Sequence, residues 1–221
     1  MSAAAGWLLA IDTATNTIVV AAGTAAGQVI ATDAFEGRYR HSQELVPAVA
    51  RLLAAEGLQL HDLAGVIVGT GPGAFTGLRV GLATAKTLAH ELRVPVAGIP
   101  SSEALLAAAA GPSLLWLPSG PRGLLRVERG GAPQVVSGDG AEIADSDLAV
   151  DLEGRAPSTA LEHGRQTLAA LGPALLRLGA ARLAAGDADD PELLVPAYGV
   201  QPRGAQGLPA DGGVAWSRDP R

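Results

Sequence analysis

The fold is decided by the stretch Gly69-Thr70-Gly71-Pro72-Gly73-Ala74-Phe75-Thr76-Gly77-Leu78-Arg79. It follows the apolar run 66–68, which is typical of a buried strand, and leads into residues 78–92, which we expect to be helical. Its glycines and Pro72 predict a backbone that turns sharply and carries few side chains. A strand, a glycine loop (residues 69–77) and a helix in this order could bind an anion at the helix N-terminus, or could simply pack closely.

Two nucleotide-binding motifs can be compared with the glycine loop. A mononucleotide P-loop needs Gly-Lys-Ser/Thr, and this tripeptide does not occur in the chain. The looser dinucleotide pattern G-x-G-x-x-G/A fits residues 69–74. However, Pro72 and Gly73 delay the helix, and the strand expected at 94–99 ends without an acidic residue for a ribose. We therefore expect the glycines to serve mainly for a tight turn and close helix packing.

Composition narrows the class of protein. A net charge of −6 gives no basic footprint for nucleic-acid binding by the chain alone, and 3% aromatic residues predict a core of Ala, Leu and Val. The absence of cysteine removes disulfides and thiol chemistry and fits a reducing compartment. Residues 1–10 lack the basic region of a secretory signal, and prolines interrupt the uncharged stretch 104–121. We therefore expect a cytoplasmic protein without a membrane span.

Hydrophobic patterning predicts an α/β protein of two lobes. The first run of elements is expected as strands at 8–11, 16–22 and 28–35, a helix from 42 to 57, a strand at 64–68, a helix at 78–92, a strand at 94–99 and a helix at 100–110. Short strands then follow at 114–117, 124–128, 134–136 and 148–152, with a helix at 173–185. We place the first lobe at residues 1–100, a smaller second α/β lobe at 101–190, and a C-terminal tail at 191–221 that is either flexible or packed back on the first lobe.

Two predicted helices carry faces suited to packing. The first has an apolar stripe formed by Leu45, Val49, Leu52 and Leu53. Pro47 lies inside this helix and predicts a distorted first turn or a later start, with Ser42 as the N-cap. The helix after the glycine loop is rich in small residues, which we expect to pack against the preceding helix, and carries Leu78 and Leu82. Its basic stripe consists of Arg79, Lys86 and His90, and is either a solvated face or a contact surface for an acidic partner or RNA.

Candidate catalytic groups are few. Asp12 and Thr13 end the first strand and could hold Mg²⁺ or a phosphate, although we favour an aspartate that caps a turn. No carboxylate stands where the second lobe begins, because the chain there has the sequence Leu117-Pro118-Ser119-Gly120. The four histidines lack metal-ligand spacing, and the motifs of zinc peptidases and serine hydrolases are missing from the sequence.

Three stretches carry the motifs of a known family. They are Leu9 to Thr15 followed by a β meander, His41-Ser42 with Leu45 and Pro47, and above all the glycine stretch from Gly69 to Gly81. Together they closely resemble the bacterial TsaB (YeaZ) family, over roughly the first half of the chain, with a weaker likeness around Tyr198 and Trp216.

The resemblance implies the actin-like, Hsp70-like ATPase fold, with two similar lobes of which the second is reduced. It implies a non-catalytic subunit that supports a paralogous catalytic subunit, TsaD. With the ATPase TsaE, such a complex attaches a threonylcarbamoyl group to adenosine 37 of tRNAs that read codons starting with A. It further implies no cofactor in this chain, ATP and Mg²⁺ being bound through partner subunits, and contact with tRNA only within the complex.

The resemblance also implies where partners bind. The family's dimer surface corresponds to Ser42–Glu56 and Thr76–Leu92, which also predicts a homodimer when the chain is alone. The implied interface residues are Leu45, Val49, Leu52, Leu53, Leu78, Arg79, Leu82 and Lys86. The residues with a structural role in the glycine loop are Gly69, Gly71, Pro72, Gly73, Phe75, Thr76 and Gly77.

The chain departs from the family at the start of the second lobe. Relatives often carry Asp-Ala-Arg there, whereas residues 117–125 have no acidic residue, which argues against nucleotide binding by this chain alone. Two alternatives stay open. One is an ATP-dependent phosphotransferase or ATPase of the same fold that uses Asp12, and the other is a dinucleotide-binding protein.

Overall fold

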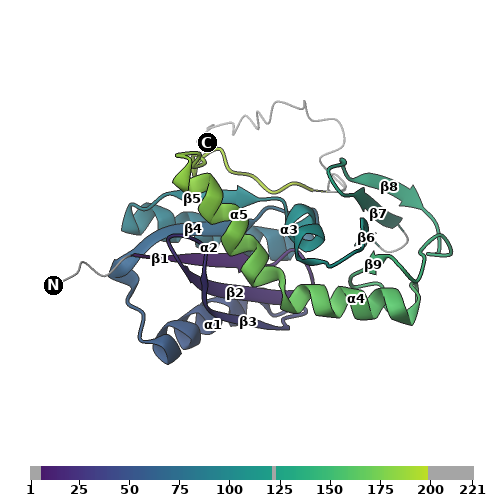
Figure 1. Cartoon of the computed structure of the whole chain (residues 1–221), viewed down its shortest axis with the longest axis horizontal. Coiled ribbons are helices and arrows are strands. Elements are labelled where there is room, and N and C mark those ends of the chain that lie inside the picture. The colour runs from purple at the N-terminus through teal and green to yellow at the C-terminus, as the bar shows by residue number, and fades with distance from the viewer. Residues whose placement is uncertain (1–5, 121–122, 199–221) are drawn as a thin grey trace, which may run out of the picture.

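Two sheets organise the chain in a computed structural model that describes residues 6–120 and 123–198 (Figure 1). The first sheet has the order β3-β2-β1-β4-β5, with β1 (Trp7–Asp12), β2 (Thr17–Thr24), β3 (Val29–Glu36), β4 (Leu63–Gly69) and β5 (Val96–Ile99). The second has the order β8-β7-β6-β9, with β6 (Leu114–Ser119), β7 (Gly123–Glu128), β8 (Gln134–Ser137) and β9 (Leu148–Ala149).

The second sheet repeats the topology of the first. In the first, β1, β2 and β3 form an antiparallel meander, β4 pairs parallel to β1, and β5 pairs parallel to β4. In the second, β6, β7 and β8 form the meander and β9 pairs parallel to β6. Within the described residues, the second sheet has no equivalent of β5. These pairings confirm the predicted α/β fold of two similar lobes, the second reduced.

Helices cover both faces of the first sheet. Helices α1 (His41–Glu56) and α2 (Phe75–Leu92) pack on one face, where Leu9 and Ile11 of β1 point. Helix α5 (Leu171–Ala184) lies across the other face, toward which Leu8 and Ala10 point, as Figure 1 shows. Because β1 is buried on both sides, it is a continuous apolar run in the sequence and does not alternate.

The remaining helices belong mainly to the second lobe. Helix α3 (Ser101–Ala108) packs beside β6, and α4 (Ser158–Ala169) packs beside β9 (Figure 1). The short 3₁₀ turn η1 (Leu60–Asp62) precedes β4. None of the helices in the described ranges combines the length and the apolar character that crossing a membrane requires.

The structure differs from the predicted division of the chain in the position of α5. This helix falls inside the predicted second lobe (101–190), yet it packs on the first sheet. Gly179 makes this possible, because a β-carbon there would lie 2.4 Å from the side chain of Ile67 in β4. The first lobe is therefore built from two separate parts of the chain.

The start of α1 also differs from the expectation. The helix begins at His41 after Arg40 as N-cap, not at Ser42, and it continues through Pro47. Pro47 is exposed and lies in the second turn. The carbonyl that it leaves without an intrahelical partner belongs to Gln43, which is also exposed, so water can satisfy that group.

After α5 the chain returns along the first sheet. The C-terminal segment, defined here as residues 187–198, first runs beside β5, where its yellow trace is seen in Figure 1. It then contacts α2 through Leu194 and Tyr198. Leu194 and Tyr198 pack against the core beneath α2. Thus residues 191–198 of the predicted tail lie on the first lobe, while residues 199–221 are outside the described part of the chain.

Candidate functional site

The glycine loop packs directly on the loop that follows β1, which we call the Asp12 loop (residues 12–16). The Ala74 amide donates a hydrogen bond to the Ala14 carbonyl at 2.6 Å. In the other direction, the Thr13 hydroxyl donates to the Gly77 carbonyl at 2.7 Å. These two bonds join the strand–helix turn after β4 to the hairpin turn after β1.

Only glycine permits this approach. A β-carbon at Gly73 would lie 2.0 Å from the Ala14 carbonyl oxygen, and one at Gly77 would lie 2.1 Å from the Thr13 carbonyl oxygen. At Gly81 a β-carbon would lie 2.3 Å from the Thr13 hydroxyl oxygen. The small residues at the start of α2 therefore face the Asp12 loop, and the expectation that they pack chiefly on the preceding helix needs this correction.

Asp12 is fully buried within this contact. Its Oδ2 accepts a hydrogen bond from the Ser101 hydroxyl at 2.5 Å, and its Oδ1 accepts one from the Ala14 amide at 2.8 Å. Burial raises the pKa of the Asp12 carboxyl, although the hydrogen bonds from Ser101 and Ala14 act in the opposite direction. A β-carbon at Gly69 would lie 1.8 Å from Oδ2. Asp12 caps its own turn, and its carboxylate is enclosed by protein atoms.

Two further residues, Ser101 and His41, complete this buried network, and their contacts with the Asp12 loop were not predicted from the sequence. Ser101, the first residue of α3, accepts a hydrogen bond from the Gly71 amide at 3.1 Å while it donates to Asp12. His41, the first residue of α1, is buried, with Nε2 2.9 Å from the Thr15 carbonyl oxygen. Both residues follow a loop and open a helix, which is the signal that could have marked them. They tie α1, α3 and the glycine loop to the Asp12 loop.

The predicted interface residues divide into an apolar group and a basic group, the latter formed by Arg79 and Lys86. The apolar ones all lie in the core of the first lobe, and they are Leu45, Val49, Leu52, Leu53, Leu78 and Leu82. Their stripes face the sheet, so they cannot themselves reach a partner. The exposed faces of the same helices carry many small side chains, among them Pro47, Ala50 and Ala54 on α1 and Thr76, Ala83 and Thr87 on α2. Larger or charged residues are exposed beside them, namely Gln43, Val46, Arg51 and Glu56 on α1 and Phe75, Arg79, His90 and Glu91 on α2.

The basic residues of α2 are partly engaged by the C-terminal segment. The Arg79 guanidinium lies 3.8 Å from the centre of the Phe75 ring, and its Nε donates to the Tyr198 hydroxyl at 3.0 Å. The rings of Phe75 and Tyr198 are 5.0 Å apart. Lys86 donates to the Leu194 carbonyl at 3.2 Å. Two members of the predicted basic stripe therefore hold the C-terminal segment.

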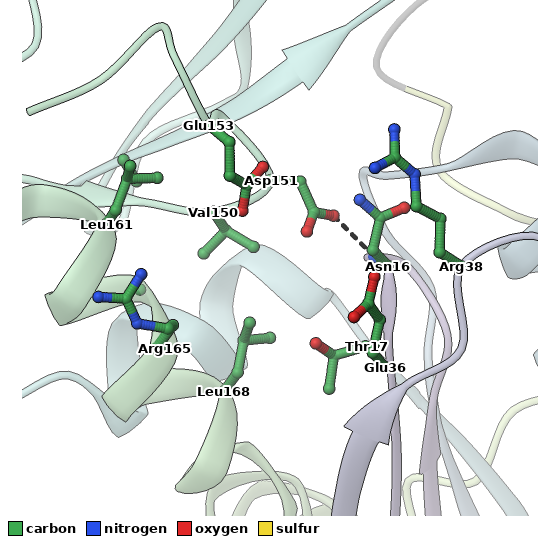
Figure 2. A pocket seen from close by; sticks show the side chains of 12 residues that line it. Asn16, Thr17, Glu36, Arg38, Val150, Asp151, Glu153, Leu161, Arg165 and Leu168 are labelled. Atoms are coloured by element: carbon green, nitrogen blue, oxygen red, sulfur yellow. Dashed lines mark hydrogen bonds between the residues drawn. The ribbon is translucent and has the colours of Figure 1, made fainter. Parts of the chain in front are cut away.

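A charged cleft of about 410 Å³ lies between the lobes (Figure 2). Its charged residues are Glu36, Arg38, Asp151, Glu153 and Arg165. Oδ2 of Asp151 accepts a hydrogen bond from the Asn16 amide at 2.7 Å, the dashed line in Figure 2, and burial raises the pKa of the Asp151 carboxyl. Across the described ranges, no group of three or more His, Cys, Asp and Glu side chains is arranged to hold a metal ion. The cleft therefore offers no assembled metal site.

The fold, with the glycine loop packed on the Asp12 loop, is similar to that of known proteins. YeaZ from Pseudomonas aeruginosa superposes with a TM-score of 0.65 at 21% identity, over 87% of this chain and 99% of that one. The chain therefore has the actin-like, Hsp70-like ATPase fold expected for it. The sequence model of the family described as "TsaD: tRNA N6-adenosine threonylcarbamoyltransferase" matches residues 36–148, which include α1, the glycine loop and α2. The chain belongs to this family, and it is similar to the TsaB (YeaZ) proteins that its sequence motifs resemble.

Relatives with similar sequences match this chain over part of their length. TsaB of Bacillus subtilis is 38% identical over 100 residues, covering 45% of this chain and 43% of that protein. TsaB of Escherichia coli is 38% identical over 92 residues, covering 42% and 39%. An uncharacterised protein of Mycobacterium tuberculosis is 41% identical over 105 residues, covering 44% and 47%. The matched part of the chain thus spans less than half the length of each of these relatives.

Proposed function

We propose that this chain is a non-catalytic partner subunit of the machinery that forms N6-threonylcarbamoyladenosine at position 37 of tRNAs reading A-starting codons. The names of the relatives from Bacillus subtilis and Escherichia coli support the biosynthetic role. One observation carries the non-catalytic part of the proposal. The space beside Asp12, where a phosphate or Mg²⁺ would have to bind, is filled by the backbone of the glycine loop. We expect such a subunit to work in the cytoplasm without a cofactor of its own.

The exposed faces of α1 and α2 support a protein partner. They carry many small or apolar side chains, such as Ala50 and Ala83, which allow another pair of helices to approach. The matched family model spans both helices, so a catalytic paralogue of TsaD type would present a similar pair, related to this one by a pseudo-twofold axis. In our proposal a TsaE-type ATPase joins this complex, tRNA is contacted through it, and the chain alone forms a homodimer.

Size-exclusion chromatography with light scattering tests the proposal. We expect a stable complex when the chain is mixed with the TsaD-type protein of the same source, and we expect Ala83→Glu to abolish it. Ala83 is exposed, so the variant should fold normally. Val135→Asp, at an exposed position on β8, is the control and should bind as the wild type does. If the wild-type chain forms no complex with or without nucleotide, the proposed function is wrong.

Calorimetry distinguishes the proposed function from the alternative, an ATP-dependent phosphotransferase or ATPase that uses Asp12. The enclosed carboxylate of Asp12 leads us to expect no heat of binding when ATP and Mg²⁺ are titrated into the chain alone. Micromolar affinity that is lost in Asp12→Asn would establish the alternative instead.

A further inference from the structure

The C-terminal segment is anchored to the edge of the first sheet by more than chain connectivity. The Asp189 amide donates to the Val96 carbonyl at 2.8 Å, which adds an antiparallel bridge to β5. Oδ2 of Asp189 accepts hydrogen bonds from the buried Gly98 amide at 2.7 Å and from Arg182 at 3.0 Å. The backbone of the segment is therefore fixed where it leaves α5.

The far end of the segment is fixed on α2 and the glycine loop. The Ala197 amide donates to the Thr70 carbonyl at 2.7 Å, and Lys86 donates to the Leu194 carbonyl. Leu194 and Tyr198 are half-buried and pack against the core. A segment held at both ends presents its remaining side chains in fixed positions, which lowers the entropy cost of binding to them.

The residues on either side of Leu194 point outward. Leu193 is 75% exposed and Val195 is 66% exposed, the two highest values among the large aliphatic side chains of the described residues. Both flank the carbonyl that Lys86 reaches, so they stand beside α2. Large apolar side chains held on an ordered backbone beside a flat helix face are typical of a surface that another protein covers.

We propose that the C-terminal segment forms the rim of the partner surface, with Leu193 and Val195 as apolar contacts beside the small-residue face of α2. This inference rests on the proposed function and deepens it. It assigns to the interface a part of the chain that is distant from α2 in sequence, since Lys86 and Leu194 are 108 residues apart.

The negative charge of the C-terminal segment indicates which partner covers Leu193 and Val195. The exposed acids Asp190 and Glu192 adjoin Leu193, and the whole chain carries a net charge of −6. A catalytic partner that binds tRNA needs a basic surface, because tRNA phosphates are neutralised by Lys and Arg. Such a partner complements the acidic rim, whereas a second copy of this chain brings the same negative charge. The occupant is therefore the catalytic, TsaD-type subunit.

Calorimetry of the full-length chain with its TsaD-type partner tests this assignment. We expect the double variant Leu193→Asp, Val195→Asp to bind roughly tenfold or more weakly than the wild type, since a charge replaces each apolar contact. Its melting temperature should be unchanged, because both side chains are exposed. Val135→Asp, also exposed and apolar but on β8, is the matched control and should bind normally. Glu192→Lys should weaken binding and flatten its dependence on salt.

The outcomes separate this inference from the proposed function. If the wild-type chain binds and the double variant binds equally well, the rim assignment is wrong while the proposed function stands. If the wild-type chain does not bind, both fail. A lower melting temperature of the isolated double variant would mean that the chain covers these side chains itself, and loss of a homodimer alone would make a second copy the occupant. Either result overturns the assignment.

Discussion

At the scale of single residues, a few glycines decide whether the Asp12 loop is open or closed. A β-carbon at Gly69 would meet the Asp12 carboxylate, and one at Gly73 would meet the Ala14 carbonyl. Glycines in a phosphate-binding loop let a ligand approach the backbone, whereas here they let another part of the backbone approach. Here the glycines therefore close the site, because the backbone of the Asp12 loop takes the space that a ligand would need.

Gly77→Ala tests this role directly. In an exposed helix, replacing glycine by alanine stabilises a protein by about 1 kcal/mol. At Gly77 we expect the opposite sign, a loss of about 1 to 3 kcal/mol in the free energy of unfolding, because the new methyl group would collide with the Thr13 carbonyl. Urea denaturation measures the difference.

Gly138→Ala provides the control for that substitution. A β-carbon at Gly138 would come no closer than 3.9 Å to another heavy atom, Oε1 of Glu142, so we expect almost no change. Equal effects of the two substitutions would contradict the role assigned to Gly77.

At the scale of elements, α2 joins three parts of the first lobe. Its glycine side faces the Asp12 loop, its leucine side faces the core, and Arg79 and Lys86 hold the C-terminal segment. Only the remaining stripe with Ala83 is open to a partner. A helix engaged on three sides presents a rigid fourth side, which suits a protein-binding surface.

Asp189→Ala should release the C-terminal segment from the sheet. The substitution leaves the buried Gly98 amide without its acceptor, which we expect to cost about 1 to 3 kcal/mol in the free energy of unfolding. Hydrogen exchange of residues 190–198 should become faster. Asp187→Ala is the matched control, since Asp187 also pairs with Arg182 but is more exposed and accepts no bond from β5, and it should change little. Similar exchange rates in both variants would argue against this anchor.

At the scale of the whole molecule, the two lobes meet across the charged cleft of Figure 2. The bond from the Asn16 amide to Asp151 links the Asp12 loop of the first lobe to the loop after β9. Asp151 adopts a left-handed backbone conformation (φ 56°), which asparagine and aspartate tolerate better than most other residues. This contact ties the second lobe to the same loop that the glycine loop closes.

Asp151→Ala should loosen the contact between the lobes. It removes the acceptor for Asn16 and places alanine in a left-handed conformation, for which we expect a loss of about 1 to 3 kcal/mol in the free energy of unfolding. Amide exchange at residues 13–17 should also become faster. Asp151→Asn keeps both an acceptor and a residue that tolerates this conformation, so it should stay close to the wild type. If the two variants behave alike, the link between the lobes does not depend on Asp151.

Much of the architecture could be predicted from local patterns. Apolar runs and turn residues indicated the strands of the first meander, β4, the glycine loop and α2, because those signals depend on neighbours in sequence. Helix α4 was missed, since its segment 158–169 is mostly polar and carries few large apolar side chains. Pro47 misled the expectation for α1, because a proline at an exposed position is tolerated within a helix.

Hydrophobic periodicity and the dense glycine motif were enough to predict the α/β class, the two-lobe repeat and the family, because these signals can be read without knowing which distant residues are in contact. The three-dimensional arrangement was needed to learn what the glycines face, which sheet α5 covers, and that the predicted leucine contacts are core residues. It also showed that the C-terminal segment lies on α2. Each of these depends on residues far apart in the chain, such as Arg79 and Tyr198, and no local pattern encodes which distant backbone will fill a given space.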